Sequence, residues 1–123
     1  GMPLILWDVD TLDWKYRDAA SVKQHILDGA QDGAIVLEHD LYETTVEGVL
    51  AAIDELQQQG YAFVTVSELA KIKGVTLEPG QVYTGFTDED LGLTAETDAA
   101  ANSESTDSTN STANTQASDS TSN

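Results

Sequence analysis

The chain reads WDVDTLDW at residues 7–14 and IVLEHD at residues 35–40. In each stretch an apolar run passes directly into carboxylates or a histidine. This pattern is typical of a buried strand that reaches the active-site edge of an α/β fold. We therefore expect the two stretches to supply one site, with Asp10, Asp13 and His39 as its candidate polar residues.

The sequence around these stretches predicts strands that alternate with helices. Apolar and β-branched runs predict strands at residues 4–9, 34–37 and 61–66, and helical periodicity predicts helices at residues 19–27, about 44–60 and 67–73. Strands and helices in this order form a parallel sheet, so the carboxyl ends of all three strands, including Thr65, are expected at one edge.

Helix ends and helix faces can also be predicted. The predicted N-caps are Asp18, Thr44 with Glu47 at capping-box spacing, and Ser67, and the predicted C-terminal glycines are Gly29 and Gly60. The apolar faces are Val22 and Ile26 on the first helix, and Val46, Val49, Leu50, Ile53 and Leu56 on the second. Residues 75–86, with a turn at Pro79-Gly80, are expected to form an extended, hairpin-like segment.

Composition divides the chain near Leu93. Residues 94–123 contain no Val, Ile, Leu, Met, Phe, Tyr or Trp. Such a segment cannot bury enough apolar surface to offset the entropy lost on ordering, so residues 94–123 are predicted to be a disordered Ser/Thr/Asn/Asp-rich tail and residues 1–93 the folded part.

Charge and residue usage exclude several classes of function. The formal net charge of −17 argues against binding to nucleic acid or to an anionic membrane surface. The chain has no cysteine, which excludes disulfides and thiolate metal sites. No apolar stretch approaches the roughly 20 residues of a membrane span, and we expect no signal peptide in this chain.

One candidate function is a phosphatase. Asp8-Val9-Asp10 after an apolar run resembles the haloacid-dehalogenase motif, in which the first Asp is a nucleophile and the second a general acid. Leu12 stands where that motif requires Thr or Val, and Thr11 replaces its small turn residue. This interpretation predicts Mg²⁺-dependent phosphate hydrolysis that is lost on Asp8→Asn.

A larger part of the sequence resembles another family. Residues 10–14 (DTLDW), 37–39 (LEH), the helix ending at Gly60, and residues 60–69 (GYAFVTVSEL) resemble, in this order, the C-terminal part of polysaccharide deacetylases of carbohydrate esterase family 4. The likeness runs from residue 4 to about residue 71 and looks greatest to the peptidoglycan N-acetylglucosamine deacetylases. It implies an irregular (β/α) barrel, of which this chain would hold the last three strands.

The resemblance implies a role for four residues. His39 would be the general acid that protonates the leaving amine, and Asp13 would contact its imidazole and stabilise the protonated form. Leu37 would line the pocket for the acetyl methyl group, and Trp14 would form part of the apolar wall of the groove. Family members use zinc or another divalent metal to polarise the acetamide carbonyl and the attacking water.

Several residues in and around these motifs also have a purely structural interpretation. Asp10 and Asp13 could bond loop amides, and Trp7, Trp14 and Tyr16 could simply pack against the core. We interpret His25, which has no partner at metal-ligand spacing, as structural.

The chain departs from the family pattern in its metal site. The Thr-Phe-Asp-Asp-Gly and His-Ser/Thr-x-x-x-His motifs that supply the base and the metal ligands are absent. We therefore expect a fragment that binds no metal and is inactive alone, from a family that acts on peptidoglycan or chitin-type N-acetylated polysaccharides outside the cell or at its surface. The alternative is a non-enzymatic glycan-binding or interaction module that uses Trp7, Trp14 and Tyr42 as a stacking surface. Unpaired sheet edges would allow either of them to self-associate.

Overall fold

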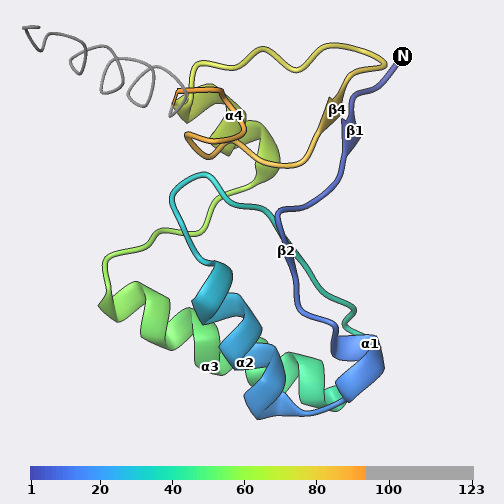
Figure 1. Cartoon of the computed structure of the whole chain (residues 1–123), viewed down its shortest axis with the longest axis vertical. Helices are drawn as coiled ribbons and strands as arrows, with labels where there is room; N and C mark the ends of the chain where they lie inside the picture. The colour runs from blue at the N-terminus through green and yellow to red at the C-terminus, as the bar shows by residue number, and fades with distance from the viewer. Residues whose placement is uncertain (94–123) are drawn as a thin grey trace, which may run out of the picture.

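A computed structural model describes residues 1–93 of the chain; the predicted tail, residues 94–123, lies outside the described residues. The elements, in chain order, are β1 (Leu4–Ile5), β2 (Val9–Asp10), α1 (Asp13–Tyr16), α2 (Ala19–Gly29), β3 (Val36–Leu37), α3 (Glu43–Gln58), α4 (Val66–Ile72) and β4 (Val82–Tyr83). Helices α1, α2 and α3 gather at one end of the described part, and α4 lies at the other end with β1 and β4 (Figure 1). No helix within residues 1–93 is long and apolar enough to cross a membrane.

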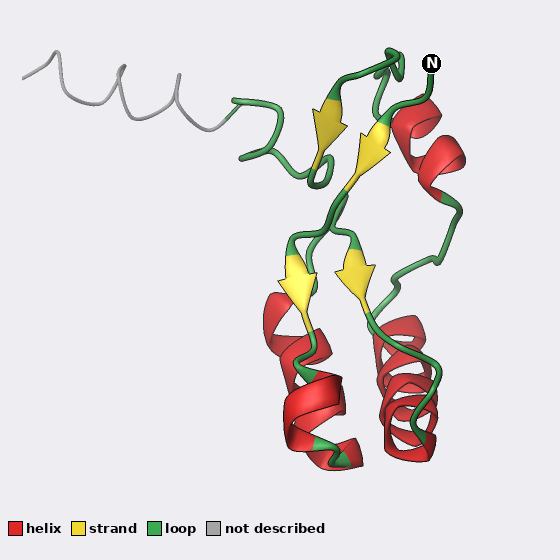
Figure 2. Ribbon diagram, turned by 90° about the vertical axis from the view of Figure 1, so that its right-hand side faces the viewer, coloured by secondary structure: helices red, strands yellow, loops and turns green. Residues whose placement is uncertain are grey.

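The strands form two separate parallel pairs rather than one sheet. β2 pairs with β3, with Val9 opposite Val36 and Asp10 opposite Leu37, which confirms the predicted parallel pairing of the first two strands. β1 pairs instead with β4 (Figure 2). The prediction of a single strand at residues 4–9 is therefore wrong in one respect: this segment forms two strands with different partners. The Leu6 amide donates to the Tyr83 carbonyl, whereas the Asp8 amide donates to the Ile35 carbonyl.

The core lies between α2 and α3, which run side by side (Figure 1). Val22 and Ile26 of α2 pack against Ala52 and Leu56 of α3, and all four side chains are buried. The helices approach closely at Gly48, where a Cβ would lie 2.6 Å from the Ala19 carbonyl oxygen. The predicted Asp18 cap is confirmed, because its carboxylate accepts a hydrogen bond from the Ser21 amide at 2.8 Å.

The predicted apolar face of α3 is only partly correct. Leu56 is buried, but Val46 and Leu50 are exposed, because the buried residues of α3 are Thr45, Gly48, Ala52 and Leu56, with Val49 packed partly against the core. The predicted Thr44 cap is also wrong by two residues, since the N-cap of α3 is Tyr42. The predicted end at Gly60 is confirmed within two residues, because this glycine has a φ of 95° that ends the helical path.

The third strand, predicted at residues 61–66, is absent from the described structure. Its first residues form no strand, and Val66 already belongs to α4. A strand requires a hydrogen-bonding neighbour, and none of the described segments pairs with this one. Thr65 caps α4 in a capping box with Glu68, so the predicted Ser67 cap is wrong by two residues.

Residues 75–86 do not form the predicted hairpin. The turn around Pro79-Gly80 is present, since the Gln81 amide donates to the Glu78 carbonyl, but the strand that follows pairs in parallel with β1. Beyond β4, the fully buried Phe86 donates its amide to the Gly33 carbonyl at 2.8 Å. This contact fixes the end of the described chain to the loop before β3.

Candidate active site

The loop after β2 positions a buried carboxylate. The Leu12 backbone is left-handed, with a φ of 51°, and its amide donates to Asp10 Oδ1 at 2.9 Å. This turn ends the strand and begins α1 at Asp13, whose side chain is only 1% exposed. Asp10 thus bonds a loop amide, as its structural interpretation proposed.

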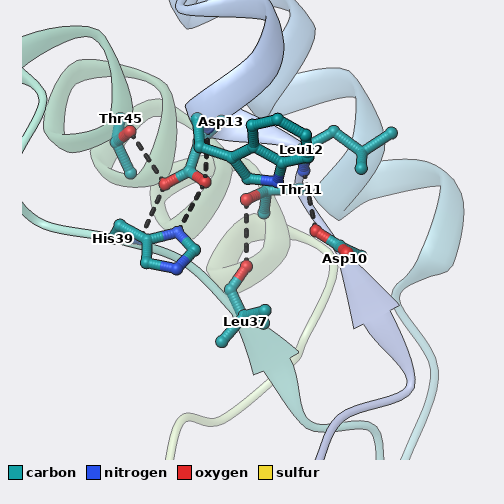
Figure 3. A network of polar contacts seen from close by, with 8 residues as sticks. Asp10, Thr11, Leu12, Asp13, Leu37, His39 and Thr45 are labelled. Atoms are coloured by element: carbon teal, nitrogen blue, oxygen red, sulfur yellow. Dashed lines mark hydrogen bonds and ion pairs between the residues drawn. The ribbon is translucent and has the colours of Figure 1, made fainter.

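Asp13 accepts four hydrogen bonds from three segments (Figure 3). His39 donates twice, from ring Nδ1 to Oδ1 at 2.8 Å and from its backbone amide to Oδ2 at 2.6 Å. Thr45 Oγ1 donates to Oδ2 at 3.0 Å, and the Trp14 amide donates to Oδ1 at 2.8 Å. The carboxylate therefore joins the ends of β2 and β3 to the first turn of α3.

These bonds determine the charge of the carboxyl. Burial alone would raise the pKa of Asp13, but the hydrogen bonds from His39, Thr45 and Trp14 outweigh burial, so its pKa lies below the usual value. Asp13 is thus a carboxylate at neutral pH, although almost no water reaches it.

The ionised Asp13 also fixes the tautomer of His39. A carboxylate only accepts hydrogen bonds, so Nδ1 of His39 must carry a hydrogen, and Nε2 is the ring atom that gains or loses a proton. The His39 side chain is 41% exposed, so a substrate can reach it from solvent. A buried anion behind a half-exposed imidazole is suited to proton transfer.

A second contact holds the same two loops together. Thr11 is fully buried, and its hydroxyl donates to the Leu37 carbonyl at 2.9 Å, across the ends of β2 and β3 (Figure 3). Sequence reasoning assigned no role to Thr11 or to Thr45. The available signal was that Thr11 lies inside the first motif and Thr45 follows the second, but a threonine hydroxyl has no periodicity that would reveal its partner.

Other candidate residues lie elsewhere. Thr65 was expected beside Asp13 but caps α4, at the opposite end of the described part from α1 (Figure 1). His25 Nδ1 donates a hydrogen bond to the Ser21 carbonyl at 2.7 Å, and the His25 ring stacks on Tyr16, in agreement with a structural role. The Tyr42 ring is covered by the Arg17 guanidinium, 4.4 Å from the ring centre.

Asp8, the nucleophile of the phosphatase interpretation, is not in the Asp13 cluster. Its Oδ2 accepts a hydrogen bond from the Ile35 amide at 3.2 Å. Burial, together with the neighbouring Asp90, raises the pKa of Asp8. Asp8 therefore packs against the loop at residues 84–93 and does not belong to the candidate site.

The described residues do not fit a catalytic metal ion. Within residues 1–93 no three His, Asp or Glu side chains converge as metal ligands. His39 Nδ1 and both oxygens of Asp13 are already engaged with one another and with nearby donors. A zinc site needs about three protein ligands, so we assign no metal to residues 1–93 and no chemical step to one.

Solved structures with a similar fold include a deacetylase and an esterase. A deacetylase solved with substrate matches with a TM-score of 0.62 and 41% identity over 66% of this chain and 40% of that one. A family 4 acetyl xylan esterase from Clostridium thermocellum, in complex with a cobalt ion, matches with a TM-score of 0.62 and 29% identity, over 68% of this chain and 44% of the esterase. The chain therefore has the fold of part of a family 4 carbohydrate esterase.

The sequence comparison finds similarity to a narrower class of proteins, the peptidoglycan deacetylases. The peptidoglycan-N-acetylglucosamine deacetylase PgdA of Listeria monocytogenes is 48% identical over 88 residues, which are 72% of this chain and 18% of PgdA. No family model matches the chain. The predicted resemblance to polysaccharide deacetylases is thus confirmed over part of the chain, which spans less than a fifth of PgdA. These relatives do not favour the phosphatase interpretation.

Proposed function

We propose that this chain supplies the proton-donating histidine of a polysaccharide deacetylase that acts on peptidoglycan or a chitin-type polymer. The observation that carries the proposal is the contact of His39 Nδ1 with the buried, ionised Asp13. Similarity to PgdA supports the choice of an N-acetylated sugar as substrate, and a role outside the cell or at its surface.

The arrangement suits the step in which the amide breaks. When the bond between the acetyl carbon and the sugar nitrogen breaks, its electron pair stays on the nitrogen, which is a poor leaving group until it gains a proton. The imidazolium of His39 gives that proton from Nε2 and becomes neutral. Asp13 keeps its charge and holds the ring by Nδ1, so the pair needs no rearrangement.

Two neighbours of this pair are proposed to hold the substrate. Trp14 follows Asp13 directly and is 53% exposed, so its indole can form a wall against a sugar ring. Leu37 lies two residues before His39, and its carbonyl accepts a hydrogen bond from the Thr11 hydroxyl. Its side chain is proposed to contact the acetyl methyl group of the substrate.

The remaining catalytic groups are proposed to come from outside this chain. The described residues fit no metal, and the sequence contains neither metal-binding motif. We therefore expect the purified 123-residue chain to release no acetate from N-acetylglucosamine oligomers with added zinc. Measurable acetate release by this chain would contradict that expectation.

A chimera tests the role of His39. The matching 88-residue stretch of PgdA is replaced by that of this chain, and acetate release from N-acetylglucosamine oligomers is measured. We expect His39→Ala to lower the rate of the chimera by about 10²–10⁴-fold, the usual contribution of a general acid. The matched control is His25→Ala, which removes the other histidine and should retain the rate. A His39→Ala chimera as fast as the control would refute the proposal.

A further inference from the structure

Two carboxyl groups meet at the start of β2, at the opposite end of the β2–β3 pair from the candidate active site. Asp8 directly precedes β2, and Asp90 belongs to the loop at residues 84–93. Gly85 lies against both side chains: a Cβ on Gly85 would clash with Asp8 Oδ2 and would lie 2.7 Å from Asp90 Oδ2. The absence of a side chain at Gly85 therefore lets the loop bring the two carboxyl groups together.

The two carboxyl groups have unequal sets of hydrogen-bond donors. Asp90 accepts three hydrogen bonds within its own loop. Thr87 donates its amide and its hydroxyl to Oδ2, at 3.0 and 2.8 Å, and Thr84 donates its hydroxyl to Oδ1 at 3.2 Å. Asp8 accepts one hydrogen bond, from the Ile35 amide at 3.2 Å. Hydrogen-bond donors stabilise the ionised form, so Asp90 is favoured as the anion and Asp8 as the group that holds a proton.

No cation balances the pair in the described part of the chain. Within residues 1–93 neither Asp8 nor Asp90 forms an ion pair with a Lys, Arg or His side chain. The other charged side chain that acts on Asp8 is Glu89, which is also acidic and adds to the repulsion. Two ionised carboxylates placed together repel each other, whereas one proton between them makes a hydrogen bond.

The pKa values of the two groups move in opposite directions. Partial burial raises the pKa of Asp8, and the neighbouring Asp90 raises it further, against the hydrogen bond from Ile35. Burial would also raise the pKa of Asp90, but hydrogen bonds from Thr87, Asp8 and Thr84 outweigh burial and lower it. Both side chains still reach solvent, so the proton can exchange with water.

The loop that carries Asp90 contacts the start of both strands. Phe86 is fully buried, and its amide donates to the carbonyl of Gly33, which lies shortly before β3. A Cβ on Gly33 would clash with the Phe86 carbonyl, so the two backbones are in close contact. The contact of Asp8 with Asp90 is a second attachment, to the start of β2. Weakening it leaves the loop attached mainly through Phe86.

We infer that Asp8 and Asp90 form a latch in which one shared proton holds the loop at residues 84–93 against the start of β2, and which opens as the pH rises. When Asp8 gives its proton to water, two carboxylates face each other and the loop loosens. The inference concerns the end of the strand pair away from His39 and does not depend on the proposed function.

The direction of the pH effect follows from both shifts. The raised pKa of Asp8 gives a contribution to stability that is complete below pH 3.8 and is lost as the pH rises through the raised value. The lowered pKa of Asp90 gives a contribution that is present above pH 3.8 and is lost as the pH falls through the lowered value. The latch is therefore closed between the two folded-state values and opens on the alkaline side.

The first experiment measures opening of the loop. Hydrogen exchange of the Phe86 amide is followed in the full chain from about pH 4 to about pH 8, relative to an unstructured peptide at each pH. We expect its protection to fall as the pH rises, in total about tenfold for each unit by which the pKa of Asp8 is raised. Asp8→Asn should keep the protection high at every pH, because its amide donates to Asp90 as the protonated acid does.

The matched control for this experiment is Glu89→Gln. It removes a neighbouring negative charge but leaves the shared proton, so most of the fall in protection should remain. Protection that is constant with pH in the parent chain, or a fall that persists in Asp8→Asn, would overturn the inference.

A second experiment distinguishes a shared proton from a bound cation. The side-chain carboxyl carbons of Asp8 and Asp90 are titrated by NMR in the full chain, without divalent cations. We expect two steps separated by more than about one pH unit. Asp90→Asn should move the Asp8 step back toward the ordinary value of 3.8. Added Ca²⁺ should leave the protection of the Phe86 amide unchanged.

Two results of the second experiment would contradict the latch. Titration of both carboxyl groups in one step near 3.8 would show that they share no proton. Recovery of the Phe86 protection at high pH on adding Ca²⁺, lost in Asp8→Asn, would show that a cation and not a proton joins the pair.

Discussion

Asp13 and His39 are joined by two hydrogen bonds, one from the ring and one from the backbone, at 2.8 and 2.6 Å. The backbone bond fixes where the loop after β3 lies, and the ring bond fixes which nitrogen faces away from the carboxylate. One buried carboxylate thus organises both the loop and the side chain that we propose to be catalytic.

The lowered pKa of Asp13 predicts a loss of stability in acid. Because the pKa is lower in the folded state, the stabilisation is complete above the unfolded value of 3.8 and is lost as the pH falls through the folded value. We expect the unfolding temperature to drop steeply below about pH 4, and Asp13→Asn to remove this dependence while costing about 3 kcal/mol at pH 7. Circular dichroism melts across this pH range measure both.

The control is Asp54→Asn, an exposed change on α3, which should leave the drop in unfolding temperature below about pH 4 unchanged. A drop that persists in Asp13→Asn would show that Asp13 is not the group responsible.

Two adjacent threonines on α3 provide a matched pair. Thr45 Oγ1 donates to Asp13, whereas Thr44 Oγ1 is buried without a hydrogen-bond partner within residues 1–93. Thr45→Val should reduce the free energy of unfolding by about 1–2 kcal/mol, because Asp13 loses a donor. Thr44→Val should be neutral or stabilising, because it removes an unpaired hydroxyl. Urea unfolding of the two variants measures the difference, and the reverse order would show that the contact at Thr45 is not stabilising.

Gly48 is expected to tolerate no side chain. A Cβ there would lie 2.6 Å from the Ala19 carbonyl oxygen and 2.7 Å from Val22 Cβ, so α2 and α3 would have to separate. Gly48→Ala should destabilise the chain by about 1–3 kcal/mol despite the higher helix propensity of alanine. Glu47→Ala, on the exposed side of the same turn, should change stability little. A Gly48→Ala variant more stable than the parent would show that the helices are not in close contact.

The raised pKa of Asp8 predicts a pH dependence of stability opposite to that of Asp13. Burial and then the nearby Asp90 raise the pKa of Asp8. Its contribution to stability is therefore complete below pH 3.8 and is lost as the pH rises through the raised pKa. We expect Asp8→Asn to raise the unfolding temperature at pH 7 and to have little effect below about pH 3.5, since the amide resembles the protonated acid.

The control for Asp8 is Glu89→Gln. Glu89 acts on Asp8 only through its charge, after the nearer Asp90, so its replacement should give a smaller increase in unfolding temperature. A lower unfolding temperature for Asp8→Asn at pH 7 would indicate that the carboxylate itself stabilises this loop.

The candidate site could be predicted in part because two of its members lie in recognisable motifs. The DTLDW and LEH stretches each end a strand, and parallel pairing of Val9 with Val36 brings those ends together. The contacts of Thr11 and Thr45 could not be predicted, because a threonine hydroxyl carries no charge or periodicity that would reveal a partner 26 or 32 residues away in sequence. The roles of Leu37 and Trp14 remain predictions.

The sequence by itself determined the existence of α2, α3 and α4, the capping of α2 by Asp18, and the pairing of β2 with β3, because helices depend on local periodicity and strands that alternate with helices pair in parallel. Only the tertiary structure decided that residues 61–64 form no strand here and that β1 pairs with β4 rather than continuing into β2. The physical reason is that a helix satisfies its backbone hydrogen bonds internally, whereas a strand exists only where a neighbour is present to bond it.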